Sequence, residues 1–288
     1  MSNVPNSVAD TEAANQVESL VTGVAKMRLD LENLGWSSKG NKETLTKRLK
    51  KAQKVGKTAG TEQEVKAVET DSVQHGPPPQ PFDYYLFFDV EATCEENDKR
   101  YPHEIIEFPV VLVDGKMFKI VDQFRSYVKP SINPVLTDFC KKLTGISQET
   151  VDESPDFISV LNDFQTWMAK YSLFQDNSAI FVTDGPFDIR DFITQQCNHD
   201  NIPVPAYFFR WVDIKKAYSR FYNCKPETIT NMLDKLGMDF EGRAHSGLDD
   251  ATNIYRIARH MFHKGYVLKK NSRHPMASVS IRKSRKDR

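Results

Sequence analysis

Four carboxylates and one histidine, spread over three segments of the chain, are the residues best suited to chemistry. Asp89 and Glu91 lie in FFDVEATC, Asp188 lies in VTDGPFDIRDF, and His245 and Asp250 lie in AHSGLDDA. Carboxylates gathered at one place repel each other unless a cation lies between them. Divalent metal ions bind such sets, and two metals held by carboxylates cut phosphodiester bonds. The set therefore predicts a two-metal hydrolytic site.

Asp89 and Glu91 are two residues apart within YYLFFDVEA, residues 84–92, an almost continuous apolar run typical of a buried central strand. Side chains on a strand alternate between faces, so both carboxylates are expected to point the same way, with Phe88 and Val90 opposite. Buried like charges on one face are costly without a cation between them. This favours a metal site, although the same triplet on an exposed strand would need no metal.

Asp188 follows the apolar run SAIFVTD, residues 178–184, in the expected turn from a strand into a helix. Ligands bind at the carboxyl edge of open α/β sheets, which makes Asp188 a candidate metal ligand. Asp184 and Asp191 lie near the same junction, and any acidic residue there can instead serve as a turn or helix cap. Phe187 fits either the core or a surface on which a base stacks.

His245 and Asp250 are five residues apart at the expected start of the last long helix. A histidine in the loop before that helix can approach the attacking water without binding a metal. Asp249 competes with Asp250, because a carboxylate in the first turn of a helix is stabilised by the helix dipole without any metal. The physics of the residues leaves this choice open.

Strands and helices alternate around these residues, which predicts an α/β domain with a mixed sheet flanked by helices. Asp114 and Gly115 lie between two apolar runs and predict a hairpin turn. Helices are predicted over 226–236 and over 247–264, the latter ended by Gly265.

The charge pattern divides the chain into parts, although the formal net charge is zero. Residues 26–54 carry nine Lys or Arg against three acids, and residues 267–288 carry eight against one. Basic ends around an acidic body favour a polyanionic ligand, with plain solubility as the alternative for the tail. We predict a disordered N-terminus, a helical hairpin, a flexible linker, the main domain and a basic tail, over residues 1–18, 19–54, 55–82, 83–266 and 267–288.

Composition argues against several classes of protein. A hydrophobic content of 39% supports a real core. No apolar run is long enough to span a membrane, and the N-terminus lacks the pattern of a secretory signal. The four cysteines form no CxxC pair, so neither a zinc site nor a disulfide framework is predicted. We expect a reduced, intracellular protein.

The motifs FDVEATC, EIIEFP, TDGPFD and HSGLDD resemble those of the DEDDh 3′-to-5′ exonucleases of the RNase-H-like fold. Within that superfamily they look most like the group of the histone-mRNA 3′-exonuclease and the enhancer-of-RNA-interference exonucleases. The resemblance covers residues 84 to 264 and includes LTGI at 143–146. It implies that Asp89, Glu91, Asp188 and Asp250 hold two Mg²⁺ or Mn²⁺ ions, with His245 as the general base.

The same resemblance implies how the substrate end is held. Glu91 and Thr93 would bind the terminal 3′-hydroxyl and ribose, and Phe187 would stack on the terminal base. The products would be nucleoside 5′-monophosphates. A monomer in the cytoplasm and in the nucleus or nucleolus is expected for this group, with a substrate-selecting RNA-binding protein as a candidate partner.

The segment 19–54 is similar to a SAP domain, a small helical module that binds nucleic acid. The likeness lies in Leu34-Gly35-Trp36, Lys39-Gly40, Lys42 and Leu45-x-x-Arg48-Leu49. The residues expected to dock nucleic acid are Lys39, Lys42, Lys47 and Arg48. A basic helix pair that merely packs on the main domain is the alternative.

Together these features predict a metal-dependent 3′-to-5′ exoribonuclease that trims structured RNA, ribosomal RNA, histone mRNA or small RNA duplexes. Two alternatives stay open. One is an exonuclease that acts on DNA as well as or instead of RNA. The other is an RNA-binding scaffold on an inactive nuclease fold, which predicts the loss of at least one metal-binding carboxylate. None of the four is missing.

Overall fold

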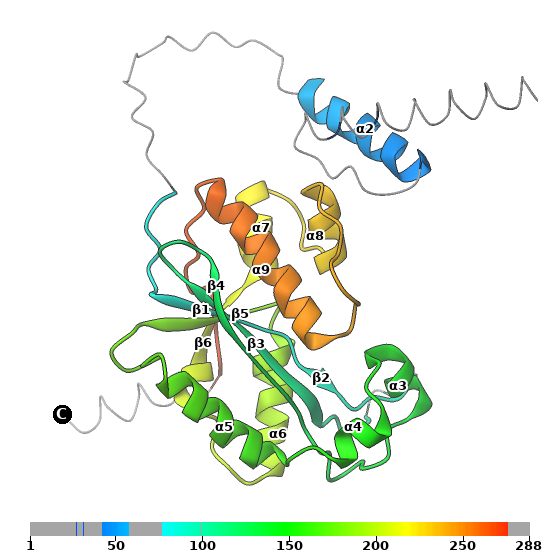
Figure 1. Ribbon diagram of the computed structural model, residues 1–288, viewed down its shortest axis with the longest axis vertical. Helices are drawn as coiled ribbons and strands as arrows, with labels where there is room; N and C mark the ends of the chain where they lie inside the picture. Colours follow the sequence, from blue (N-terminus) through cyan, green and yellow to red (C-terminus); the bar gives the residue numbers. More distant parts are fainter. Residues whose placement is uncertain (1–26, 28–30, 32–41, 58–76, 99, 276–288) are drawn as a thin grey trace, which may run out of the picture. The chain divides into compact units, whose positions relative to one another are not determined.

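A computed structural model describes residues 27, 31, 42–57, 77–98 and 100–275 of the chain (Figure 1). The chain divides into two compact units, which we describe separately. One comprises Met1–Val73 with Asp234–Asp239, and the other comprises Gln74–Leu233 with Phe240–Arg288. The predicted disordered N-terminus, most of the linker, Lys39 and most of the basic tail lie outside the described residues.

The first unit contains the helix α2, Lys42–Lys57. Leu45 of this helix is buried against Leu31, and Met27 and Leu49 pack around the pair. Apolar side chains at helical spacing thus form a small core around α2.

A mixed sheet of seven strands forms the centre of the second unit within the described residues. The strands are β1 Tyr84–Phe88, β2 Glu91–Ala92, β3 Ile105–Asp114, β4 Ile120–Tyr127, β5 Ala179–Thr183, β6 Arg210–Asp213 and β7 Ser272–Arg273. Their order is β2-β3-β1-β5-β6-β7, with β4 paired to β3. β1, β5 and β6 run parallel, and the other pairs are antiparallel. The predicted hairpin is the β3–β4 connection.

Helices cover this sheet on both faces, which confirms the predicted α/β class (Figure 1). The helices that follow α2 in the described residues are α3 Asp138–Thr144, α4 Gln148–Asp152, α5 Phe157–Ala169, the π-helix η1 Phe187–Ile193, α6 Thr194–His199, the 3₁₀-helix η2 Ala206–Phe209, α7 Ile214–Tyr222, α8 Ile229–Lys235 and α9 Gly247–His263. No helix in the described residues is long and apolar enough to cross a membrane.

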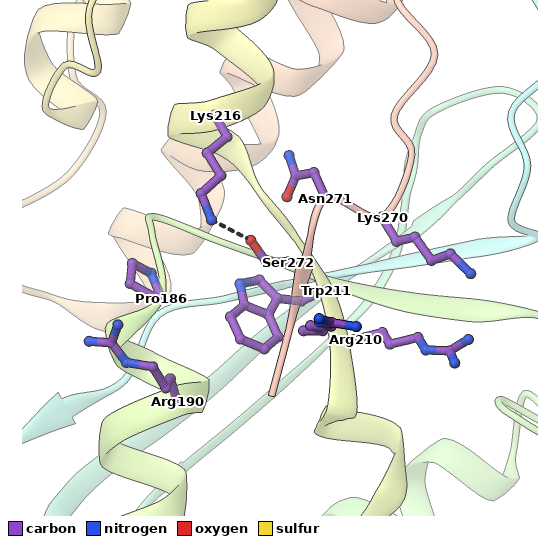
Figure 2. A pocket seen from close by; sticks show the side chains of 9 residues that line it. Pro186, Arg190, Arg210, Trp211, Lys216, Lys270, Asn271 and Ser272 are labelled. Atoms are coloured by element: carbon purple, nitrogen blue, oxygen red, sulfur yellow. Dashed lines mark hydrogen bonds between the residues drawn. The ribbon is translucent and has the colours of Figure 1, made fainter. Parts of the chain in front are cut away.

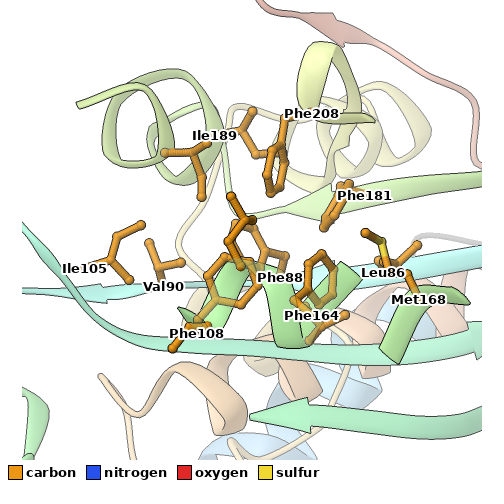
Figure 3. Close-up of a cluster of buried hydrophobic side chains, with 14 of the residues drawn as sticks. Leu86, Phe88, Val90, Ile105, Phe108, Phe164, Met168, Phe181, Ile189 and Phe208 are labelled. Atoms are coloured by element: carbon orange, nitrogen blue, oxygen red, sulfur yellow. The ribbon is translucent and has the colours of Figure 1, made fainter. Parts of the chain in front are cut away.

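The strand β1 presents its two faces to different helices. Phe88 belongs to the main hydrophobic cluster together with Phe164 of α5, as Figure 3 shows. Phe87 instead packs against Tyr255 of α9, with ring centroids 5.6 Å apart. Alternation along the strand therefore assigns even-numbered residues to the α5 side and odd-numbered residues to the α9 side.

The continuous strand expected over 84–92 is interrupted, because β1 ends at Phe88 and β2 begins at Glu91. A register shift against β3 occurs between Glu91 and Ala92. Val90 still lies in the main hydrophobic cluster, so Asp89 and Glu91 stay on the side of α9 (Figure 3). Such irregularities re-aim side chains at the end of a ladder, and here they follow directly after the candidate ligands.

Candidate active site

Asp89 and Asp188 come together because they follow neighbouring parallel strands. Asp89 comes directly after β1 and Asp188 lies in η1, which follows β5. An oxygen of the Asp188 carboxylate accepts a hydrogen bond from the backbone N–H of Val90 at 3.1 Å. Burial, followed by the nearby charge of Asp188, raises the pKa of the Asp89 carboxyl well above its usual range.

The two competitors of Asp188 have partners of their own. Asp184 forms an ion pair with Lys215 at 2.9 Å. Asp191 forms an ion pair with Arg190 at 2.6 Å and lies at the surface side of η1. Of the three carboxylates near this strand end, Asp188 is the one that is buried against Asp89.

Asp250 reaches the same place from the first turn of α9. It is 7% exposed, and its charge acts on both Asp89 and Glu91. Asp249 points elsewhere, because its carboxylate accepts a hydrogen bond from the backbone N–H of Arg243 at 2.9 Å. The geometry thus separates the two residues that the sequence left as alternatives.

His245 lies in the loop before α9 and is exposed. Its backbone N–H donates to Asp250 Oδ2 at 2.8 Å, so one carboxylate oxygen holds the loop that carries the imidazole. Its φ angle of 63° lies in the left-handed region, which is rare for residues other than glycine. Strained backbone of this kind persists where surrounding contacts enforce it, often at active sites.

The sequence reasoning missed Glu107 of β3, which holds the start of α9. Its buried carboxylate accepts hydrogen bonds from the backbone N–H groups of Gly247 at 3.2 Å and Leu248 at 3.4 Å, and from Arg125 at 2.8 Å. A carboxylate at a helix N-terminus satisfies free donors and favours the helix dipole. The signal was present, because a charged residue within the apolar run IIEFPVVLV requires a buried partner.

The electrostatics of the four carboxylates is dominated by burial. Burial, with neighbouring carboxylates as the next cause, raises the pKa of Glu91 to about 9 and the pKa of Asp89 well above its usual range. Burial also raises the pKa of Asp250 to about 7 and that of Asp188 to about 6. The fold therefore holds these acids where their charged forms are disfavoured unless a cation joins them.

The chemistry of this set fits divalent metal ions. All four groups supply carboxylate oxygens, which Mg²⁺ and Mn²⁺ prefer, and none of them pairs with a Lys or Arg in the described part of the chain. Within those residues, no three His, Cys, Asp or Glu side chains are already closed around one metal position. The fit therefore rests on donor type and on uncompensated charge.

Thr93 requires a correction. Its side chain is buried, and its hydroxyl accepts a hydrogen bond from the backbone N–H of Glu104 at 2.9 Å and donates one to the carbonyl of Pro102 at 3.4 Å. The side chain therefore points into the fold. Contrary to the expectation from the sequence, its hydroxyl is not free to donate a hydrogen bond to a substrate ribose. The register shift after Glu91 breaks the alternation on which a shared face of Glu91 and Thr93 would depend.

Phe187 is 56% exposed in η1, directly before Asp188. The guanidinium of Arg190 lies 5.5 Å from the centroid of its ring. A large exposed aromatic side chain beside a buried acid is suited to stacking on a base and excludes the alternative of a core position.

The predicted docking residues lie in the first unit. Lys42 is exposed on α2, and Lys47 is exposed in an ion pair with Glu43 at 2.8 Å. Arg48 is only 10% exposed and pairs with Asp239, a residue of the same unit. Lys42 and Lys47 can reach a ligand without rearrangement, whereas Arg48 is already engaged.

Comparison with known proteins gives the same picture. The family model described as Exonuclease matches residues 86–258, from β1 into α9, and so includes all four carboxylates and His245. The 3′-5′ exoribonuclease 1 of Rattus norvegicus is 38% identical over 251 residues, which is 86% of this chain and 69% of that protein. The chain belongs to the exonuclease family.

Solved structures agree with this assignment. The nuclease domain of 3′hExo, a DEDDh family member bound to rAMP, is 41% identical and matches with a TM-score of 0.67, over 68% of this chain and all of that one. A 3′-exonuclease solved in recognition of the histone mRNA stem-loop is 41% identical, with a TM-score of 0.65, over 67% of this chain and 87% of that one. The predicted RNase-H-like fold and 3′-to-5′ exoribonuclease activity are confirmed.

Proposed function

We propose that this exonuclease trims single-stranded RNA 3′ ends next to base-paired stems, with two divalent ions held by Asp89, Glu91, Asp188 and Asp250. The observation that carries the proposal is the convergence of these four buried or half-buried carboxylates from β1, β2, η1 and α9. When bound, Mg²⁺ or Mn²⁺ would lower the pKa of the attacking water and would neutralise the charge that develops on the phosphate.

The chain's own residues do the remaining work. The imidazole of His245 accepts the proton of the water, and its exposure lets it reach the substrate phosphate. The hydrogen bond from the His245 backbone to Asp250 fixes the loop of the base relative to the carboxylates. Phe187 stacks on the terminal base and orients the last phosphodiester bond, so that nucleoside 5′-monophosphates leave one by one.

The similar structures and the basic parts of the chain support the proposed substrate class. One 41% identical 3′-exonuclease is described in recognition of the histone mRNA stem-loop. In this chain the exposed cations Lys42 and Lys47 of α2 would contact the phosphates of such a stem, while the carboxylate site takes the free end. An RNA-binding protein that selects the stem would be compatible with this division.

Turnover on matched substrates tests the proposal. Single-stranded RNA, a stem-loop with a 3′ tail, a duplex with a 3′ overhang and the corresponding DNA are compared with Mg²⁺ and with EDTA. We expect shortening of the RNAs from the 3′ end in Mg²⁺ and none in EDTA. Equal turnover of DNA would favour the broader exonuclease, and binding without turnover would favour the scaffold.

Two substitutions test the site itself. Asp89→Ala should abolish Mg²⁺-dependent shortening of RNA and leave RNA binding largely intact; full activity would refute the assignment. His245→Asn keeps a side chain that tolerates the left-handed backbone but removes the base. We expect kcat to fall by about 10²–10⁴-fold, while RNA binding in EDTA stays largely intact.

A further inference from the structure

A cavity of about 620 Å³ lies at the outer edge of the sheet, between η1, β6, the start of α7 and β7 (Figure 2). Five basic side chains line it and no acidic side chain does: Arg190, Arg210, Lys216, Lys270 and Arg273. The volume falls within the range of about 300–1,000 Å³ of small-ligand sites, so it accommodates more than a single ion.

Three of these cations have no ion-pair partner in the described part of the chain: Arg210, Lys270 and Arg273, all of them exposed. Lys216 is held in place by Ser272 Oγ at 2.8 Å, which Figure 2 shows, and by Asp213 at 3.3 Å. Arg210, Lys270 and Arg273 therefore repel each other, and a bound anion would relieve that repulsion.

Trp211 adds an independent observation. Its side chain lines the cavity but is only 1% exposed, and its indole nitrogen has no hydrogen-bond acceptor among the described residues. Figure 2 shows the indole ring amid the lining side chains, near Lys216 and Ser272. A buried indole N–H without an acceptor costs about 1–3 kcal/mol, which an oxygen of a bound anion would recover.

The cavity adjoins the candidate active site along the chain. Pro186 and Arg190 line it, while Phe187 and Asp188 between them belong to the carboxylate site. Arg190 lies both in the cavity lining and 5.5 Å from the Phe187 ring centroid. A strand whose last base stacks on Phe187 therefore has one basic side chain of the cavity, Arg190, on the same helix.

We propose that this cavity is a phosphate-binding subsite that holds a backbone phosphate of the RNA strand upstream of its 3′ terminal nucleotide. Guanidinium forks and ammonium groups bind phosphate oxygens, and a buried N–H donor adds a fixed hydrogen bond. The inference rests on the proposed function, because it assumes that the 3′ end of the RNA binds at the four carboxylates. The subsite makes longer strands better substrates than a dinucleotide.

A length series tests the subsite separately from catalysis. The variant Lys270→Ala/Arg273→Ala removes two exposed cavity cations, and Lys119→Ala/Lys170→Ala removes two exposed cations from the β3–β4 turn and the end of α5. Cleavage of a diribonucleotide and of longer single-stranded RNAs is measured at several salt concentrations. The cavity variant should lose roughly tenfold in kcat/KM on long RNA, with a smaller salt slope, and keep dinucleotide turnover.

Other outcomes of the length series would contradict the proposed phosphate-binding role of the cavity. Equal losses in the cavity variant and the control variant would mean nonspecific charge attraction. Loss of dinucleotide turnover would place the cations in the chemical step, and absent turnover in the unmodified protein would refute the proposed function instead. Inhibition of dinucleotide cleavage by inorganic phosphate that the cavity variant abolishes would assign the cavity to free phosphate. Trp211→Phe removes the N–H donor and leaves a smaller ring. If the variant folds with unchanged dinucleotide turnover, it should weaken cleavage of long RNA.

Discussion

At the scale of single residues, the site is defined by which carboxylate turns inward. Asp249 and Asp250 are adjacent in α9 but have different partners. Asp249 accepts a hydrogen bond from the backbone of Arg243, whereas Asp250 lies near Asp89 and Glu91. A change of one position on a helix rotates a side chain by about a quarter of a turn, which is enough to separate the two roles.

Isosteric substitutions of these neighbours test the separation. Asp250→Asn should reduce Mg²⁺-dependent kcat at least about a hundredfold, because a charged oxygen ligand of the ions is lost. Asp249→Asn should keep activity within a few-fold and lower the melting temperature slightly, since only the hydrogen bond to Arg243 weakens. Equal losses of activity in both variants would show that the first turn of α9 acts as a unit.

The raised pKa values of the carboxylates predict how stability depends on pH. In the folded, metal-free protein, the pKa values of Glu91, Asp188 and Asp250 are about 9, 6 and 7, above their unfolded values. The folded state then binds more protons than the unfolded state, so the free energy of unfolding falls as pH rises from about 4 to about 9.

Melting temperatures in EDTA should therefore decrease from about pH 5.5 to about pH 8, and Mg²⁺ should raise them more at the higher pH. Asp89→Ala removes one member of the repelling set and should flatten this dependence. A melting temperature that rises with pH in EDTA, or an equal Mg²⁺ effect at both pH values, would contradict the account.

At the scale of elements, the site depends on how closely α9 approaches the end of β1. A methyl group on Gly247 would collide with the carbonyl oxygen of Asp89 and lie 2.8 Å from the ring of Pro109. The carboxylate of Glu107 accepts hydrogen bonds from the backbone N–H groups at the start of the same helix. The absence of a side chain at Gly247 thus lets the helix bring Asp250 to the strand end.

Gly247→Ala should push the start of α9 away from β1. We expect a destabilisation of about 1–3 kcal/mol together with a loss of activity larger than stability alone explains. Gly265→Ala is the matched control at the other end of α9, where φ is +86° and no atom lies within 4 Å. It should cost about 1–2 kcal/mol through backbone strain and leave kcat unchanged. If both variants lose kcat equally, helix position does not control the site.

At the scale of the whole molecule, the exonuclease match and the predicted docking residues fall in two different compact units. The family match covers 86–258, whereas α2 and its small core lie in the other unit. Catalysis and stem recognition should therefore be separable by mutation.

Removal of residues 1–54 should weaken binding to a stem-loop RNA and reduce the salt dependence of that binding, because Lys42 and Lys47 no longer meet phosphates. Cleavage of a short single-stranded RNA serves as the control and should stay within a few-fold. Affinity and salt slope that do not change would assign the N-terminal segment to another role and leave the SAP-like prediction without support.

The sequence alone determined the α/β class and the order of the chemical residues, because both follow from local patterns. Alternation along β1 already assigned Phe88 and Val90 to one face and Asp89 and Glu91 to the other, even though the strand is interrupted between them. Periodicity is a local property that survives a short break in hydrogen bonding.

Only the tertiary structure decided which candidates meet. Lys215 engages Asp184 and Arg243 engages Asp249, which leaves Asp188 and Asp250 for the site. Lys215 lies far from Asp184 in the chain. Arg243 is only six residues from Asp249, but the course of the loop before α9 brings the two together, and no helix or strand pattern predicts that course. The inward orientation of the Thr93 side chain likewise depends on contacts with Glu104 and Pro102, which lie on the other side of a register shift. The basic cavity depends on the return of β7 to the edge of β6.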